Sequence, residues 1–99
     1  MKAEIVYEDD DFLVFDDINP KADLHLLLTP KEHIESVDYL EDRHKDLMGK
    51  MFILASRLAK EQKFAQQGYK LLFNVGRGAG QAVDHLHMHI LSGKNKELP

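Results

Sequence analysis

The sequence predicts an α+β fold, in which a five-stranded, mostly antiparallel sheet packs against one long helix. Short apolar segments separated by turn residues come first, and a long segment with helical spacing of apolar residues follows. Two further strand-like segments, joined by glycines, come last. Strands grouped before and after one helix are typical of α+β proteins. We expect a single domain over residues 1–99, with flexible ends at residues 1–4 and 94–99.

The first three expected strands are short and are separated by recognisable turns. Glu8–Asp11 supplies the acidic side chains that favour a reversal of the chain. Asp17–Pro20 is expected to form a loop, because proline cannot donate to a β-ladder and holds the preceding residue extended. Pro30 ends the third strand for the same reason. The expected strands are Ile5–Tyr7, Phe12–Phe15 and Asp23–Thr29.

Apolar residues then recur at helical spacing over Glu41–Gln66, which predicts one long helix. Asp38, followed three residues later by Glu41, indicates a capping box at its start, and Gly68 indicates its end. His44 is expected on the exposed side of this helix. The remaining expected elements are a strand at Tyr69–Val75, a glycine-rich connection at Gly76–Ala82 and a strand at Asp84–Leu91.

Composition excludes several classes of protein. Of the 99 residues, 43% are hydrophobic and 30% are charged, as in folded globular chains. The net charge of −4 argues against a non-specific nucleic-acid binder, which needs a basic surface. With no cysteine, the chain forms no disulfide and no thiolate metal site. It also lacks a signal-peptide pattern and any apolar run of about 18 residues. We therefore expect a cytoplasmic protein with neither nucleic-acid nor membrane partners.

The segment His85–Ile90 alternates histidines with apolar residues. In a strand, alternate side chains point to opposite faces, so the three imidazoles are expected on one face and the apolar side chains in the core. A solvated or hydrogen-bonded histidine stripe is the simplest interpretation. Three histidines on one face nevertheless favour a functional site, because such sites collect titratable groups.

Two chemistries suit this histidine face. A metal ion can take only two of the three, because the outer pair lies roughly 13 Å apart in a strand, and it would need His25 or Asp17 as a further ligand. Alternatively, the central imidazole attacks phosphorus through Nε2, while an acceptor holds its Nδ1 proton. Its neighbours would donate to phosphoryl oxygens or protonate the leaving group. This second arrangement fits the spacing better.

The glycine-rich segment that precedes the histidines is compatible with phosphate binding. Glycines in Gly76–Gln81 let backbone N–H groups approach an anion closely. The side chains of Gln81 and Asn74 are available as further amide donors. The segment opens no helix, so it does not match a dinucleotide-binding fingerprint. By itself it is also compatible with a plain hairpin connection.

Together these residues resemble the histidine triad (HIT) family. His85–Leu91 is similar to the family's motif of three histidines alternating with apolar residues, and Gly80 and Gln81 precede it as in the family. The upstream blocks Ile5–Asp10, Phe15–Pro20 and His25–Ile34 resemble the Hint branch in order and spacing. The resemblance covers most of the chain, from Ile5 to Gly93. It implies a HIT-like fold and a homodimer whose sheet continues across the interface.

The resemblance also implies catalytic roles. His87 would be the nucleophile that carries a nucleotidyl-histidine intermediate. The backbone carbonyl of His85, one of the two flanking histidines, would hold the Nδ1 proton of His87, and His89 would contact the phosphate. His25 would complete a proton relay. No metal and no cofactor is implied.

For the nucleotide, the resemblance implies that Asp17 accepts hydrogen bonds from the ribose hydroxyls. Ala82 stands where this branch often has serine, so weaker assistance to the leaving group is expected. The chain starts almost at the first strand, so its base selectivity is expected to differ from that of longer relatives. The implied nucleotide-binding residues are Phe15, Ile18 and Leu27 around the base, and Asn74, Gly80, Gln81, Ala82 and Val83 around the phosphate.

The implied function is hydrolysis of P–N bonds in purine nucleoside 5′-phosphoramidates, with release of AMP or GMP. Ser92 and Gly93 after the motif resemble the Hint branch. A dinucleoside polyphosphate hydrolase is one alternative, and a low-turnover nucleotide-sensing or interaction dimer is another. A nucleotidyltransferase is disfavoured, because that branch has glutamine where this chain has His89.

Overall fold

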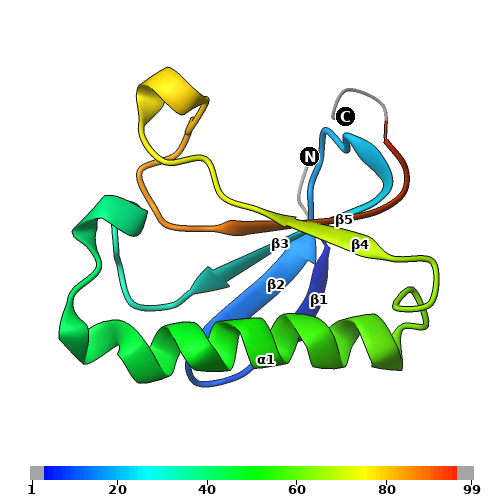
Figure 1. The fold of residues 1–99 in the computed structure, drawn as a ribbon, viewed down its shortest axis with the longest axis horizontal. Coiled ribbons are helices and arrows are strands. Elements are labelled where there is room, and N and C mark those ends of the chain that lie inside the picture. The colour runs from blue at the N-terminus through cyan, green and yellow to red at the C-terminus, as the bar shows by residue number, and fades with distance from the viewer. Residues whose placement is uncertain (1–3, 96–99) are drawn as a thin grey trace.

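Five strands form one sheet in the spatial order β1-β2-β3-β5-β4, and α1 (Lys45–Glu61) crosses one of its faces (Figure 1). The computed structural model describes residues 4–95. Every neighbouring pair of strands is antiparallel, which confirms the predicted α+β fold. The strands are β1 (Ile5–Glu8), β2 (Phe12–Asp16), β3 (Ala22–Pro30), β4 (Tyr69–Leu72) and β5 (Met88–Asn95).

The core lies between the sheet and α1. Leu28 and Met88 are opposite each other on β3 and β5, and neither is exposed to solvent. Met51 and Leu58 of α1 belong to the same buried cluster. Because the apolar side chains of α1 recur on one side, burying that side excludes water from this cluster. Within residues 4–95 no helix is both long and apolar enough to cross a bilayer; the cytoplasmic location stays a prediction.

The start of α1 differs from the sequence prediction. The helix begins at Lys45, after two short 3₁₀ turns at residues 37–39 and 42–44. The expected capping box between Asp38 and Glu41 is not the one that forms. Instead, the backbone N–H of Glu41 donates to Nδ1 of His44 at 2.9 Å. His44 was expected at the surface, but it is buried, and its Nε2 lies 3.0 Å from Glu32.

The end of α1 also comes earlier than predicted. The helix ends at Glu61 rather than at Gln66, well before Gly68. Lys63 adopts a left-handed conformation with φ of 65°, which turns the chain out of the helix. This reversal places Phe64 in the core, where it is buried. The helix end therefore coincides with the burial of an aromatic side chain and comes before the glycine.

The last strand is shifted along the sequence. β5 begins at Met88, not at Asp84, because the N–H of Leu86 bonds to the carbonyl of Ile34 and not to a neighbouring strand. It continues to Asn95, which pairs with Ala22, so part of the expected flexible tail lies in the sheet. β4 ends at Leu72, three residues earlier than predicted. At the other expected flexible end, the carbonyl of Glu4 accepts the N–H of Asp16 at 3.0 Å, whereas residues 1–3 and 96–99 lie outside the described residues.

The register of the sheet aligns one row of side chains on the face opposite α1. Phe15 of β2 pairs with Leu27 of β3, Leu27 pairs with His89 of β5, and His89 pairs with Leu72 of β4. Directly opposed residues of antiparallel strands share a face. The face that α1 leaves uncovered therefore carries an apolar row with a histidine in it.

We expect Leu28→Ala to lower the free energy of unfolding by about 2–5 kcal/mol, because it removes fully buried methyl groups and leaves a cavity against Met88. Urea unfolding at one protein concentration measures the change. Ile53→Ala is the matched control, because Ile53 is 67% exposed on α1; its effect should stay within about 0.5 kcal/mol. Equal effects of the two substitutions would contradict this placement of the core.

Candidate active site

A cavity of about 460 Å³ lies on the face of the sheet opposite α1. Its size is that of a small-molecule site. It is bounded by the loop after β2 on one side and by the segment between β4 and β5 on the other. The lining residues are Asp17, Asn19, Lys21, His25, Leu27, Leu72, Asn74, Gly80, Ala82, Val83, His87, His89 and Leu91.

His87 is held in one orientation by its own backbone neighbourhood. Its Nδ1 lies 2.7 Å from the carbonyl oxygen of His85. A carbonyl only accepts, so Nδ1 of His87 must carry a proton and donate it. The neutral imidazole then has its lone pair on Nε2, the form that can attack an electrophile. Because His87 lines the cavity, this nucleophilic nitrogen belongs to the site.

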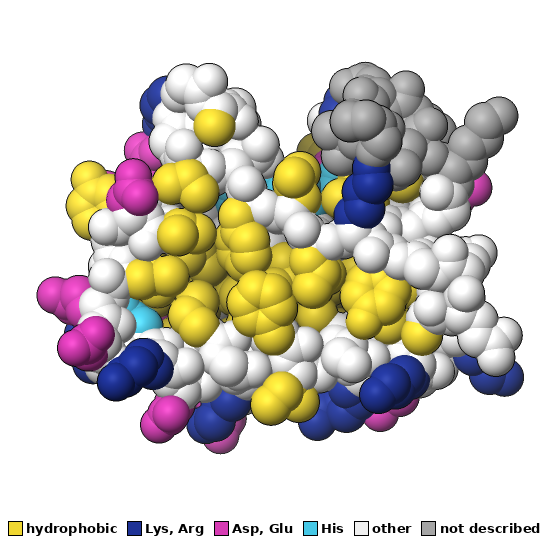
Figure 2. Space-filling view, in the orientation of Figure 1, with side chains coloured by type: hydrophobic (Ala, Val, Ile, Leu, Met, Phe, Trp, Pro, Cys, Tyr) yellow, Lys and Arg dark blue, Asp and Glu magenta, His cyan; other side chains and the backbone are white. Residues whose placement is uncertain are grey.

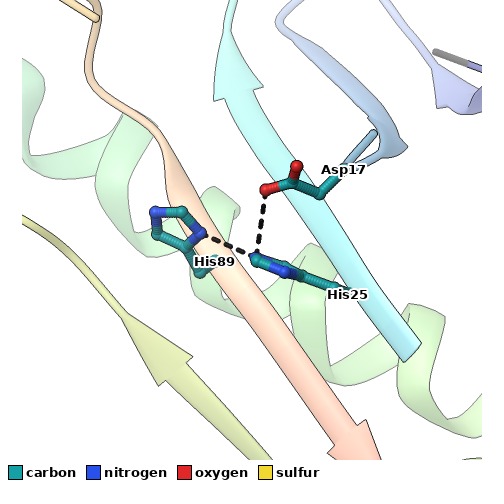
Figure 3. Close-up of side chains that lie close together, drawn as sticks. All are labelled: Asp17, His25 and His89. Carbon is teal, nitrogen blue, oxygen red and sulfur yellow. Dashed lines mark hydrogen bonds and ion pairs between the residues drawn. The ribbon is translucent and has the colours of Figure 1, made fainter. Parts of the chain in front are cut away.

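His25 and His89 form a second hydrogen-bonded unit (Figure 3). Nε2 of His25 lies 2.8 Å from Nδ1 of His89 and 3.4 Å from Oδ2 of Asp17. Burial, together with the nearby His87 and His25, lowers the pKa of His89 to about 4, while Asp17 opposes the shift. Burial also lowers the pKa of His25. Both rings are therefore neutral at pH 7.

Asp17, His25 and His89 are also the group of described residues that could hold a metal ion, since their ligand atoms lie within 4.8 Å of one another. Two nitrogens bound to one tetrahedral zinc ion, each at 2.0–2.1 Å, lie roughly 3.3 Å apart. The His25–His89 separation of 2.8 Å is shorter and is that of a hydrogen bond. This conformation thus suits a shared proton better than a shared metal ion.

The structure does not bring all three histidines of the motif into the cavity. The rings of His87 and His89 are neighbours, with centroids 5.0 Å apart. Nε2 of His85 instead lies 2.8 Å from the carbonyl of Pro30, and its ring packs edge-on against His33. The strand that would have aligned the three begins only at Met88. His85 contributes its backbone carbonyl to the site.

The residues expected around the base occupy different positions. Leu27 lines the cavity, and Phe15 lies beside it in register on the same face. Ile18 is 54% exposed in the loop after β2 and is not among the lining residues. Asp17 lines the cavity from the same loop, with its Oδ1 already accepting the N–H of Asn19 at 2.8 Å.

Gln81 is buried, and its side-chain amide is engaged within the protein. Its Nε2 donates to the carbonyls of Glu35 at 2.6 Å and Val83 at 2.9 Å, and its Oε1 accepts the N–H of Gly76 at 2.8 Å. Its contact with phosphate therefore stays a prediction. These bonds hold the loop that brings Gly80, Ala82 and Val83 to the cavity. Gly80 has φ of 92°, a conformation that favours glycine.

Asn74 lines the cavity beside this loop, and its Nδ2 donates to the carbonyl of Ala79 at 2.8 Å. Sequence reasoning missed four lining residues: Asn19, Lys21, Leu72 and Leu91. Two of them could have been found from the sequence, because side chains two residues apart in a strand point to the same face. Leu91 follows His89 by two residues, and Leu72 precedes Asn74 by two.

We expect stability to fall as the pH is lowered from about 6.5 to about 4, because the folded-state pKa of His89 lies below the value of an unfolded histidine. In this range the unfolded chain binds more protons, which favours unfolding. His89→Gln should make this fall shallower. Denaturant unfolding across the pH range measures the slope.

The control for this prediction is Ile53→Ala, which changes an exposed side chain of α1 and no titratable group. It should keep the pH dependence of the wild type. A His89→Gln protein whose stability still falls as steeply as that of the wild type would contradict the assigned burial of the His89 ring.

Comparison with known proteins places this geometry in a family. The HIT domain model matches residues 1–96. Protein HitA of Neisseria gonorrhoeae is 46% identical over 89 residues, which cover 90% of this chain and 82% of that protein. The purine nucleoside phosphoramidase of Escherichia coli K12 is 38% identical over 92 residues, or 93% of this chain and 77% of the enzyme.

Solved structures show the same fold. A HIT family hydrolase from Legionella pneumophila superposes with a TM-score of 0.92 at 39% identity, covering 100% of this chain and 88% of that one. A histidine triad protein from Clostridium difficile gives 0.90 at 40% identity, covering 100% and 84%. From the match over residues 1–96 and these relatives, we conclude that the chain belongs to the HIT family.

Proposed function

We propose that this chain is a nucleotide hydrolase that cleaves the P–N bond of purine nucleoside 5′-phosphoramidates through a covalent intermediate on His87. The observation that carries the proposal is the bond from Nδ1 of His87 to the carbonyl of His85, which leaves Nε2 free as a nucleophile in the cavity. The name of the E. coli relative, purine nucleoside phosphoramidase, supports the substrate class.

In the first step, Nε2 of His87 attacks phosphorus, and the bond between phosphorus and the leaving nitrogen breaks as the new N–P bond forms. The leaving nitrogen takes its electron pair from the broken bond and departs as a neutral amine, with a proton that comes from solvent or is already on that nitrogen. The attacking ring becomes cationic, and the carbonyl of His85 stabilises it by accepting from Nδ1. In the second step, water attacks phosphorus and loses a proton to solvent, the N–P bond breaks with its electron pair returning to Nε2 of His87, and the nucleoside monophosphate leaves.

The nucleoside portion would occupy the part of the cavity beside the loop after β2, where Asp17 lies. Oδ1 of Asp17 accepts from Asn19, and Oδ2, which lies 3.4 Å from Nε2 of His25, would accept hydrogen bonds from the ribose hydroxyls. Leu27, with Phe15 beside it in register, provides an apolar wall for the base. Ala82 has no hydroxyl to offer the leaving group. Backbone N–H groups of the segment between β4 and β5 would bind the phosphate.

Adenosine 5′-phosphoramidate is the test substrate. We expect wild-type protein to release AMP, as followed by phosphorus NMR, and EDTA to leave the rate unchanged. His87→Ala should lower the rate by at least about a thousand-fold, since it removes the nucleophile. Mass spectrometry of quenched reactions should find the nucleotidyl group on His87.

His33→Ala is the control, because it removes an exposed histidine outside the cavity. Faster turnover of a dinucleoside polyphosphate than of the phosphoramidate would replace the proposed substrate class. AMP binding without turnover of either compound would favour a nucleotide-sensing protein, and loss of activity in EDTA would favour a metal site.

We also propose that the chain forms a homodimer through β4 and α1. In the described sheet β4 is an edge strand, paired only with β5. Figure 2 shows hydrophobic side chains gathered over β4 and the adjoining side of α1. Phe52 of α1 is 48% exposed and packs against Phe73, with ring centroids 6.2 Å apart. An exposed edge beside an apolar patch suits pairing with a second copy.

We expect Phe52→Glu to shift the protein from dimer to monomer in sedimentation velocity experiments, because the substitution places a charge in the apolar patch. Ile53→Glu is the matched control, since Ile53 lies next along α1 but belongs to a cavity lined by Asp11 and Arg57. A monomeric wild type, or equal effects of both variants, would contradict the proposed interface.

A further inference from the structure

A chain of hydrogen bonds runs from the backbone of the loop after β2 into the cavity. The N–H of Lys21 donates to Nδ1 of His25 at 3.0 Å. A backbone N–H can only donate, so Nδ1 of His25 must be an acceptor without a proton. Neutral His25 therefore carries its single ring proton on Nε2.

The hydrogen bond between His25 and His89 then determines the tautomer of His89. Nε2 of His25 lies 2.8 Å from Nδ1 of His89 and has the proton, so it is the donor. Nδ1 of His89 is then the acceptor, and neutral His89 carries its proton on Nε2. This second nitrogen lies on the side of the ring away from His25, and His89 lines the cavity (Figure 3).

From this chain we propose that the backbone N–H of Lys21 is a positioning group that fixes the proton of His89 on Nε2, so that His89 meets a phosphoryl oxygen as a neutral donor. The phosphoryl ligand rests on the proposed function, whereas the two ring tautomers do not. The cavity would then present two different nitrogens: an N–H on His89 and a lone pair on His87.

The loop that carries this N–H is held by two hydrogen bonds of Asp17. The N–H of Asp17 donates to the carbonyl of His25 at 2.9 Å, and Oδ1 of Asp17 accepts from Asn19. The ring of Pro20 fixes the φ angle of Pro20, which limits the backbone conformations directly before Lys21. The side chain of Lys21 takes no part in the bond to His25, so the positioning effect belongs to the main chain.

The same chain limits proton transfer. A further proton on the pair would need Nδ1 of His25 or Nδ1 of His89, and each of these already faces an N–H. The other charged or titratable groups facing the pair are Asp17, which favours protonation, and Lys21 and His87, which oppose it. Removing the proton from neutral His25 would leave an anionic ring. We therefore assign the pair as a hydrogen-bond donor chain and not as a source of protons.

Long-range ¹H–¹⁵N correlation spectra of the ¹⁵N-labelled protein test this inference directly, because they distinguish Nδ1–H, Nε2–H and cationic rings. His25→Gln and His89→Gln assign the signals. We expect Nε2–H rings for His25 and His89 and an Nδ1–H ring for His87. His89 should stay neutral at about pH 5.5, where an ordinary histidine is mostly charged. An Nδ1–H ring for His25 or His89 at pH 7, or a cationic His89 ring at pH 5.5, would overturn the inference.

Lys21→Pro removes the donor N–H, and Lys21→Ala keeps it. We expect the proline variant to lose the uniform Nε2–H pattern of His25 and His89, and the alanine variant to keep it. An unchanged pattern in a folded proline variant would overturn the role of the Lys21 amide. If the proline variant does not fold, the wild-type spectrum still decides, because a His25 ring with Nδ1–H cannot accept from Lys21.

These outcomes separate the inference from the proposed function. Predicted tautomers in a protein that does not hydrolyse adenosine 5′-phosphoramidate would retain the positioning role and refute the hydrolase. Hydrolysis of this substrate by a protein with Nδ1–H rings at His25 and His89 would support the hydrolase and refute the positioning role.

Discussion

The pairing of β3 with β5 builds the core and the cavity on opposite faces of the same two strands. Leu28 pairs with Met88 on the face covered by α1, and Leu27 pairs with His89 one residue along, on the opposite face. A shift of the register by one residue would exchange these faces and place the imidazole in the core. The buried leucine and methionine side chains therefore specify where the histidine lies, and stability and chemistry depend on one register.

The imidazoles of the site obtain their orientation from the main chain. The carbonyl of His85 accepts from His87, and the N–H of Lys21 donates to His25. The described residues contain no buried side-chain nitrogen or oxygen without a hydrogen-bond partner. Main-chain groups cannot change protonation state, so they fix a tautomer over a wide pH range. A site arranged in this way is preorganised before a ligand arrives, which reduces the entropy lost on binding.

The sequence was sufficient to predict the α+β class, the first three strands and the burial of the apolar residues that alternate with histidines. It could not predict where β5 begins, because the N–H of Leu86 bonds to Ile34, a residue distant in the sequence. Alternation assigns faces only where the chain is paired as a strand, so the ring of His85 lies outside the cavity. Main-chain donors such as Lys21 N–H are present in every non-proline residue, and only three-dimensional placement distinguishes one from another.

The arrangement of donors also restricts the substrates that the proposed reaction can accept. The leaving nitrogen needs a proton as its bond to phosphorus breaks, because an amide anion is a very poor leaving group. Neutral His25 and His89 each carry a single ring proton, and giving it up would leave an anionic ring, so the pair does not supply the proton. Ala82 lines the cavity without a hydroxyl. The proton must therefore come from solvent or from the leaving group itself. This requirement favours basic leaving amines, which take up a proton from water most readily, and it places the chemical selectivity of the site on the leaving group.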